Sequence, residues 1–261
     1  MTKKNKPVVL VISNAKGGVA KSTTASAVSA GFNRLGKRVL MIDADPQTNL
    51  SISFIPDSEE VPTLYNVFKG EKSIKDVQIN IRDGLDLVPG DFDLCGADME
   101  FFGKIGSLNI LSRAIKDVES DYDYVVIDTP PNLGCLTLNS LTAGDYTVVP
   151  LSMDSFALKS IRLLSDTLNS LKENGHEIKV AGVLLTKYSG RTNIDKILEK
   201  NVQDSADLLG TTVFQHRIRQ GVAVREAQLL KQDIFSYAPA SNVAMDYDGF
   251  IHELLERIGE R

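Results

Sequence analysis

The sequence predicts an α/β fold with a mostly parallel, twisted sheet flanked by helices. Short runs that are apolar on both faces alternate with segments of helical periodicity. A glycine-rich, basic loop follows the first of these runs, and aspartates end two later ones. The 261 residues are 43% hydrophobic and 24% charged, a composition that supports one globular core. We therefore predict a single domain that spans residues 1–261.

The expected elements follow one another along the chain. Apolar runs predict strands at residues 8–12, 39–42, 85–88, 122–128, 146–151 and 180–187. Helical spacing predicts helices at residues 25–35, 63–68, 94–102, 108–118, 157–171 and 241–258. Parallel strands end at one edge of a sheet, so we expect the polar residues that follow them to share a ligand-binding edge.

Residues 14–24 join the first strand to the first helix and read Asn-Ala-Lys-Gly-Gly-Val-Ala-Lys-Ser-Thr-Thr. Gly17 and Gly18 let the backbone approach an anion, and the start of a helix adds amide groups and about half a positive charge. We expect Lys21 to reach the β- and γ-phosphates of a nucleotide and the Ser22 hydroxyl to bind Mg²⁺. The stretch therefore predicts a phosphate-binding site.

This loop departs from the general pattern G-x-x-x-x-G-K-[ST], because Ala15 and Ala20 occupy its glycine positions. It matches the variant Lys-Gly-Gly-Val-x-Lys-[Ser/Thr], in which Lys16 precedes Lys21 by five residues. Here the chain resembles the ParA/MinD family of deviant-Walker ATPases, which implies a P-loop NTPase fold. The resemblance implies that Lys16 reaches across a dimer interface to the nucleotide of the other subunit. At Ala20 we expect a small effect on nucleotide affinity.

Two aspartate motifs follow predicted strands. Residues 43–47 read Asp-Ala-Asp-Pro-Gln, and residues 128–131 read Asp-Thr-Pro-Pro. A carboxylate at a strand end can contact Mg²⁺ directly or through water. Both motifs resemble those of the family, which implies that Asp45 positions or activates the attacking water. The same resemblance places Asp43 and Asp128 at the Mg²⁺ site and lets the segment after Asp128 sense the γ-phosphate.

The resemblance also implies which residues hold ATP and Mg²⁺. Those implied to bind the nucleotide are Lys16, Gly17, Gly18, Val19, Ala20, Lys21, Ser22, Thr23 and Thr186, the last from the region that helps form the adenine pocket. Lys16, Lys21 and Asp45 are implied to act in catalysis, and Ser22, Asp43 and Asp128 to serve the metal.

Basic residues gather between residues 187 and 231 of a chain whose net charge is −5. A local basic patch can bind DNA in an acidic protein. The candidate DNA-binding residues are Lys187, Arg191, Lys196, Lys200, Arg217, Arg219 and Arg225. The resemblance implies a DNA-binding segment here, although the family's usual Pro-Arg-Asn is absent. The alternative interpretation is that these cations are scattered over solvated helix faces.

These motifs predict a ParA-type ATPase for plasmid or chromosome partition. The resemblance implies an ATP-dependent sandwich homodimer that binds non-specific DNA and is released when a ParB-like centromere-binding adaptor protein stimulates hydrolysis. One alternative is a MinD-like or cargo-positioning ATPase that acts on membranes or protein clusters. Another is a small-molecule enzyme on the same fold, such as an ATP-dependent ligase of the dethiobiotin synthetase type.

The remaining features favour a cytoplasmic, nucleoid-associated protein without a membrane partner. The chain has no apolar run of 18 residues, and residues 253–261 carry three glutamates that an anionic membrane would repel. Cys95 and Cys135 have no metal or disulfide spacing, and we interpret them as buried or half-buried thiols. An acidic cluster in residues 91–100 is interpreted as a solvated face that can keep DNA away.

Overall fold

The computed structural model describes residues 6–56, 61–152, 154, 157–189, 200–203 and 205–260. Its strands are β1 (Val8–Ile12), β2 (Val39–Asp43), β3 (Ile79–Arg82), β4 (Leu85–Val88), β5 (Tyr124–Asp128), β6 (Tyr146–Ser152), β7 (Lys179–Tyr188) and β8 (Ile218–Arg219). They form one eight-stranded sheet in the order β3-β4-β2-β5-β1-β6-β7-β8. Only the edge pair β3–β4 is antiparallel within this sheet. The predicted α/β class is confirmed.

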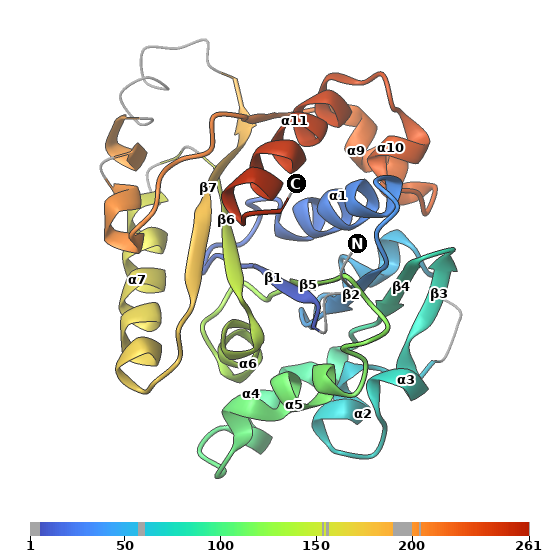
Figure 1. The fold of residues 1–261 in the computed structure, drawn as a ribbon, viewed down its shortest axis with the longest axis vertical. Helices are drawn as coiled ribbons and strands as arrows, with labels where there is room; N and C mark the ends of the chain where they lie inside the picture. Colours follow the sequence, from blue (N-terminus) through green and yellow to red (C-terminus); the bar gives the residue numbers. More distant parts are fainter. Residues whose placement is uncertain are drawn as a thin grey trace.

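Helices cover both faces of the sheet (Figure 1). They are α1 (Lys21–Arg34), α2 (Leu64–Phe68), α3 (Ile74–Val77), α4 (Ala97–Phe101), α5 (Ile110–Lys116), α6 (Cys135–Ala143), α7 (Ala157–Glu173), α9 (Val222–Leu229), α10 (Ile234–Tyr237) and α11 (Asn242–Arg257). Short 3₁₀ turns are η1 (Ser51–Ser53), η2 (Phe92–Gly96), η3 (Ser107–Asn109) and η4 (Asp207–Leu209). Figure 1 shows α1 and α11 on one side of the sheet and α5 and α6 on the other.

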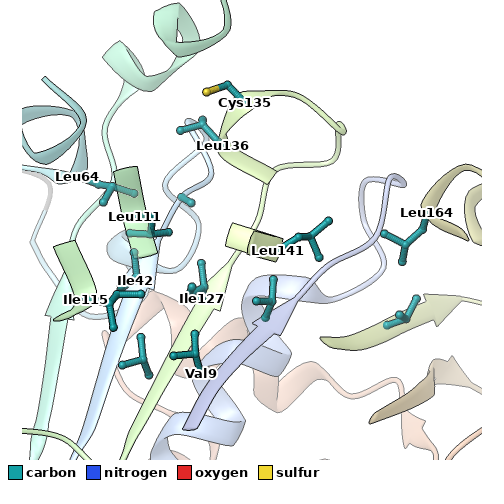
Figure 2. Close-up of a cluster of buried hydrophobic side chains, with 14 of the residues drawn as sticks. Val9, Ile42, Leu64, Leu111, Ile115, Ile127, Cys135, Leu136, Leu141 and Leu164 are labelled. Carbon is teal, nitrogen blue, oxygen red and sulfur yellow. The ribbon is translucent and has the colours of Figure 1, made fainter. Parts of the chain in front are cut away.

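Two hydrophobic clusters lie on opposite faces of the central strands. Val9 and Val11 of β1 belong to the cluster beneath α5, α6 and α7, whereas Leu10 and Ile12 belong to the cluster beneath α1 and α11. Figure 2 shows part of the first cluster, with Val9, Ile42 and Ile127 of the sheet near Leu111, Leu141 and Leu164 of the helices. Because both faces are covered, the strands read as continuous apolar runs.

The register of the central strands sets the position of the site. Asp128, the last residue of β5, lies opposite Ile12 of β1 and Asp43 of β2. The loop that follows β1 and the loop that follows β2 therefore begin at the same edge of the sheet. This is the carboxyl edge, where ligands bind in open parallel sheets.

Helix α11 packs closely on α1, on the same face of the sheet. Gly31 in the last turn of α1 permits the approach, because a Cβ atom there would lie 2.3 Å from Cδ1 of Ile251. The hydroxyl groups of Tyr247 and Thr24 lie 3.1 Å apart and share a buried hydrogen bond. Among the described residues, none of the helices is both long and apolar enough to cross a bilayer.

Several element boundaries differ from the predicted ones. Helix α1 starts at Lys21 rather than at residue 25, because the small polar residues of its first turn carry no apolar periodicity. The predicted helix 94–102 is a 3₁₀ turn followed by the short α4. The sequence does not predict strands β3 and β8 or helices α3, α6, α9 and α10, since these elements are short or interleave apolar residues with polar ones. Cys135 is buried as expected, but Cys95 is exposed, so that expectation was wrong.

Candidate active site

A cleft of about 820 Å³ opens at the carboxyl edge of the sheet, between the β1–α1 loop and the β8–α9 segment. This volume is in the range of small-molecule and cofactor sites. Its lining includes the predicted site residues Gly17, Gly18, Ala20, Lys21, Ser22, Thr23, Asp45, Thr186, Lys187, Arg219 and Arg225. The structure thus brings residues from both halves of the sequence to one cleft.

The loop backbone is shaped for an anion. Gly18 and Ala20 both adopt left-handed conformations, with φ of +72° and +66°. Such a conformation costs an L-residue with a side chain about 1–2 kcal/mol, which explains why glycine is the usual residue at the Ala20 position. No side chain caps the N-terminus of α1, and its first turn carries no acidic residue. Its first amide groups are therefore available to a phosphate.

Lys21 lies at the bottom of the cleft and is almost fully buried. Its Nζ donates a hydrogen bond to the backbone carbonyl of Lys16 at 3.1 Å. Burial lowers the pKa of the Lys21 ammonium, while the nearby carboxylates of Asp128 and Asp45 act in the opposite direction. The Lys16 carbonyl of the loop thus holds the Lys21 ammonium in position before a ligand binds.

The Asp128 carboxylate is fully buried, and neither of its oxygens has a hydrogen-bond partner within the described chain. Burial raises its pKa well above the ordinary value, as does the Asp43 carboxylate, while Ser22 and Lys21 oppose the shift. A buried carboxylate without a donor needs a compensating group. Hard oxygen ligands suit Mg²⁺, so Asp128 and the Ser22 hydroxyl fit this ion.

No three His, Cys, Asp or Glu side chains of the described residues group into a metal site. This agrees with the way Mg²⁺ is held in phosphate sites, where one or two protein groups act together with phosphates and waters.

The two aspartates of residues 43–47 serve different purposes. Oδ2 of Asp43 accepts hydrogen bonds from the Ser51 amide at 2.7 Å and the Ser51 hydroxyl at 2.6 Å, and Oδ1 accepts one from the Asp45 amide at 3.1 Å. Asp43 therefore orders the loop that carries Asp45. Burial raises the pKa of Asp43 to about 6. Burial also raises the pKa of Asp45, whose carboxylate lines the cleft and accepts from the Gln47 amide at 2.9 Å.

Lys16 turns away from the cleft that holds Lys21. Its Nζ forms an ion pair with Asp154 and donates to Oγ of Ser152 at 3.4 Å, at the end of β6. Its backbone amide donates to Oδ1 of Asn14, whose Nδ2 donates to the carbonyl of Pro150 at 2.7 Å. Both side chains of the Lys16–Asp154 pair are partly exposed. The two lysines of the loop therefore point to different places.

Two threonines tie neighbouring segments to the loop. The buried Thr129 hydroxyl donates to the carbonyl of Ile12 at 3.0 Å, and the Thr186 hydroxyl donates to the carbonyl of Val19 at 3.1 Å. A Cβ atom at Gly17 would lie 3.7 Å from Cβ of Pro131, so the Asp-Thr-Pro-Pro segment packs directly on the loop. Thr186, which lines the cleft, thus holds the loop in place through the Val19 carbonyl.

The predicted DNA-binding residues divide into three groups. Lys187, Arg219 and Arg225 line the cleft itself. Lys200 is exposed away from it, and Arg217 donates to the carbonyl of Gln215 and stacks 5.3 Å from the ring centre of Tyr188. Arg191 and Lys196 lie outside the described residues.

Arg219 is already paired within the chain. Its guanidinium donates to Asp246 from Nη2 at 2.6 Å and from Nε at 2.9 Å, and its backbone amide donates to the same carboxylate. The Asp246 carboxylate raises the pKa of Arg219. Sequence reasoning missed this partner and Asp154, because each pair joins segments that are distant in the chain.

The geometry can now be compared with known proteins. The family model described as an AAA domain matches residues 8–181. The sporulation initiation inhibitor protein Soj of Bacillus subtilis is 32% identical over 243 residues, which are 92% of this chain and 94% of Soj. The chromosome partitioning protein ParA of Caulobacter vibrioides is 33% identical over 258 residues, which are 97% of this chain and 96% of that relative. The chain belongs to the ParA/Soj family of ATPases.

A solved structure supports the same fold for this ParA/Soj member. Cobyrinic acid a,c-diamide synthase from Mycobacterium smegmatis, with a bound ATP analog and magnesium, superposes with a TM-score of 0.83. It is 30% identical, and the match covers 97% of this chain and 96% of that one. The predicted family, α/β fold and ATPase activity are thereby confirmed, and the roles of the individual site residues stay predictions.

Proposed function

We propose that this ParA/Soj chain is a partition ATPase that moves a plasmid or a chromosome. With ATP and Mg²⁺ it forms a sandwich homodimer that binds non-specific DNA. A ParB-like centromere-binding protein stimulates hydrolysis, which separates the dimer and releases the DNA. The proposal places the protein in the cytoplasm, on the nucleoid.

The residues of the cleft can perform this hydrolysis. Bound Mg²⁺ would neutralise charge on the β- and γ-phosphates, and Ser22 and Asp128 are the residues that would hold it. The first amides of α1 and the Lys21 ammonium would position the phosphates. Asp45, which is buried yet lines the cleft, would accept a hydrogen bond from the attacking water.

The observation that carries the proposal is the separation of the two loop lysines. Lys21 points into the cleft of its own chain, whereas Lys16 is held at the end of β6 by Asp154 and Ser152. A cation on the rim of one subunit can serve the phosphates of a second subunit that faces it. A cation supplied in trans to GTPases raises turnover by about 10³–10⁵.

Three exposed cations support the DNA-binding part of the proposal. Lys187, Lys200 and Arg225 are exposed, and none of them takes part in an ion pair with another described residue. Two subunits would double this set and make a larger basic surface.

The test is binding to non-specific duplex DNA with ATP, with ADP and without nucleotide, at low and moderate salt. We expect binding only with ATP, with log K falling by about 0.9 per phosphate contact for each log unit of salt. Lys16→Ala should abolish it, and Lys75→Ala, which removes an exposed lysine elsewhere, should not. If wild type binds no DNA under any condition, the proposal fails.

A second candidate is a small-molecule enzyme on the same fold. It is favoured by the likeness to the cobyrinic acid a,c-diamide synthase, which is 30% identical to this chain. Such an enzyme has no use for a lysine that serves another subunit. Full ATPase activity in Lys16→Ala, together with absence of DNA binding, would favour this candidate over partition.

A membrane-positioning role finds no support in the last helix. The apolar side of α11 is already packed in the core, where Tyr247, Phe250 and Leu254 are fully buried. We therefore expect the protein not to sediment with anionic vesicles, with or without ATP.

A further inference from the structure

An exposed apolar surface lies outside the cleft, on η2, α4 and the turn after it. Phe92, Met99 and Phe102 are between 65% and 94% exposed, and Ile105 is fully exposed. The neighbouring Leu94, Ala97 and Phe101 are buried and anchor the segment to the helical layer of α5 and α6. We call residues 91–106 the α4 surface. Large apolar side chains gathered on one exposed segment are typical of interaction sites.

The α4 surface is also acidic. It carries Asp91, Asp93, Asp98 and Glu100 against one cation of its own, Lys104, while Arg113 donates to the Gly106 carbonyl and Lys69, which is near Glu100, is paired with Glu71. Within the described chain these carboxylates accept hydrogen bonds from neutral donors, such as the Tyr65 hydroxyl on Glu100, and none of them forms an ion pair. These four carboxylates outnumber the cations Lys104 and Arg113, so the surface keeps net negative charge that an external cation can neutralise.

This charge decides between possible occupants. DNA would be repelled, and Figure 1 shows α4 on the other side of the sheet from α9 and α11, which carry or adjoin the basic residues. An anionic membrane would be repelled for the same reason. A second copy of this chain brings the same negative surface. The surface interleaves acidic residues with apolar ones. A cationic amphipathic segment of another protein matches it in both charge and apolar contacts.

The α4 surface is connected to the nucleotide cleft. The Asp98 carboxylate accepts a hydrogen bond from the Cys135 amide at the N-terminus of α6. Gly134 permits this contact, because a Cβ atom there would lie 2.3 Å from Oδ2 of Asp98. Helix α6 starts four residues after Pro131, which packs on Gly17 of the phosphate loop. A partner on α4 is thus two contacts away from the phosphate loop.

We propose that the α4 surface is a docking site for a cationic amphipathic segment of a partner protein. We also propose that binding there changes the dynamics of the N-terminus of α6. The inference rests on the proposed function in one respect, namely that a partner protein regulates hydrolysis. The binding itself needs neither DNA nor a dimer.

The probe is a fluorescent synthetic peptide of about 18 residues, with leucine and lysine at helical spacing, and its leucine–glutamate counterpart as control. Fluorescence anisotropy measures its binding to the full chain. We expect the lysine peptide to bind and the glutamate peptide not to bind. Met99→Ser/Phe102→Ser should weaken binding by about tenfold or more, as the loss of apolar anchors does in protein interfaces. Asp93→Asn/Glu100→Gln should weaken it by a smaller factor and reduce its salt dependence.

Matched controls lie on α7. Leu163→Ser removes another exposed apolar side chain, and Asp166→Asn/Glu173→Gln removes two exposed acidic charges. Neither should change peptide binding. Equal losses in the α7 and α4 variants, or no binding to wild type, would overturn the inference. Self-association of wild type that Met99→Ser/Phe102→Ser abolishes in sedimentation would also overturn it, because the occupant would then be a second copy.

Hydrogen exchange gives the second readout. Exchange of the amides in residues 132–139 should change when the peptide binds wild type and stay constant with Met99→Ser/Phe102→Ser. An unchanged rate in wild type would refute the connection through Asp98. The α4 variants should still bind DNA in the presence of ATP. If wild type does not bind the peptide but still binds DNA with ATP, this inference alone is rejected. If wild type binds the peptide but shows no ATP-dependent DNA binding, the partition proposal is rejected.

Discussion

The cleft has a buried floor and an exposed rim, and the two treat charge differently. Under the floor, beside Lys21 and Ser22, the Asp128 carboxylate is fully buried and has no hydrogen-bond partner among the described residues. On the rim, Arg219 is paired with Asp246, and next to the rim, outside the cleft lining, Lys16 is paired with Asp154. The buried carboxylate therefore needs a bound ligand such as Mg²⁺ as its partner. The paired cations, by contrast, must give up an internal ion pair before they can bind an external group. The buried residues suit the binding of Mg²⁺ and nucleotide, and the exposed, paired cations suit contacts that form and break during a cycle.

The largest effect is expected from the floor, with Lys21→Ala. Removing the ammonium that the loop already positions should lower ATP turnover by about 10²-fold or more. Phosphate release measures it, with Lys75→Ala as the control for an exposed lysine. A turnover close to that of wild type would show that the floor is not the site of hydrolysis.

Asp128→Asn should separate activity from stability. Turnover should fall by a similar factor, because the amide is a poor ligand for Mg²⁺. In the absence of nucleotide, the variant should be more stable than wild type at neutral pH by about 1–3 kcal/mol, since the cost of burying the carboxylate outweighs its attraction to Lys21 and Ser22. Urea unfolding with and without Mg²⁺-ATP measures both states. A variant that is less stable than wild type without nucleotide would contradict the view that the buried Asp128 carboxylate destabilises the free protein.

The same carboxylate gives the wild type a pH dependence of known sign. Folding raises the pKa of Asp128 well above its ordinary 3.8 and that of Asp43 to about 6. Between the unfolded and folded pKa values the folded chain holds more protons, so stability falls as pH rises from about 4 through 6. Asp128→Asn should show a smaller fall. Unfolding midpoints at pH 5 and pH 7 test this, and a wild-type stability that rises over the interval would refute it.

On the rim, Arg225→Ala and Arg219→Ala sharpen the comparison. Arg225 is exposed and has no ion pair with a described residue, so its loss should weaken ATP-dependent DNA binding and reduce the salt slope by about 0.9. Arg219 is held by Asp246, so its loss should change the slope less. Filter binding over a salt series distinguishes the two. Equal changes in slope would mean that the internal pair opens on DNA.

The smallest effect is expected from Asp154→Asn, which releases Lys16. A partly exposed ion pair contributes about 0–1 kcal/mol, so the population of the ATP-bound dimer should rise by up to about fivefold. Sedimentation with a non-hydrolysable ATP analogue measures this, and Asp121→Asn, which releases Lys75, is the matched control. A dimer population that falls would show that Asp154 serves the dimer rather than restraining it.

The floor could be predicted from sequence because its residues are local. A strand end, a glycine-rich loop and a helix start follow one another, so Gly17, Lys21 and Ser22 carry their own signal. The rim could not, because its pairs form between distant segments: Lys16 meets Asp154 138 residues away, and Arg219 meets Asp246 27 residues away. Only the packing of β6 and α11 brings these partners together, and no local pattern in the sequence indicates it.

One hydrogen bond connects the two parts of the cleft. The Thr186 hydroxyl, at the end of β7, donates to the Val19 carbonyl in the phosphate loop. β8 pairs with β7 beside it and leads into α9, which carries Arg225. Local openings of a protein occur in cooperative units whose members exchange their amide protons together. We therefore expect the phosphate loop and the end of β7 to open together, so that a nucleotide that slows amide exchange in the loop also slows it at the end of β7.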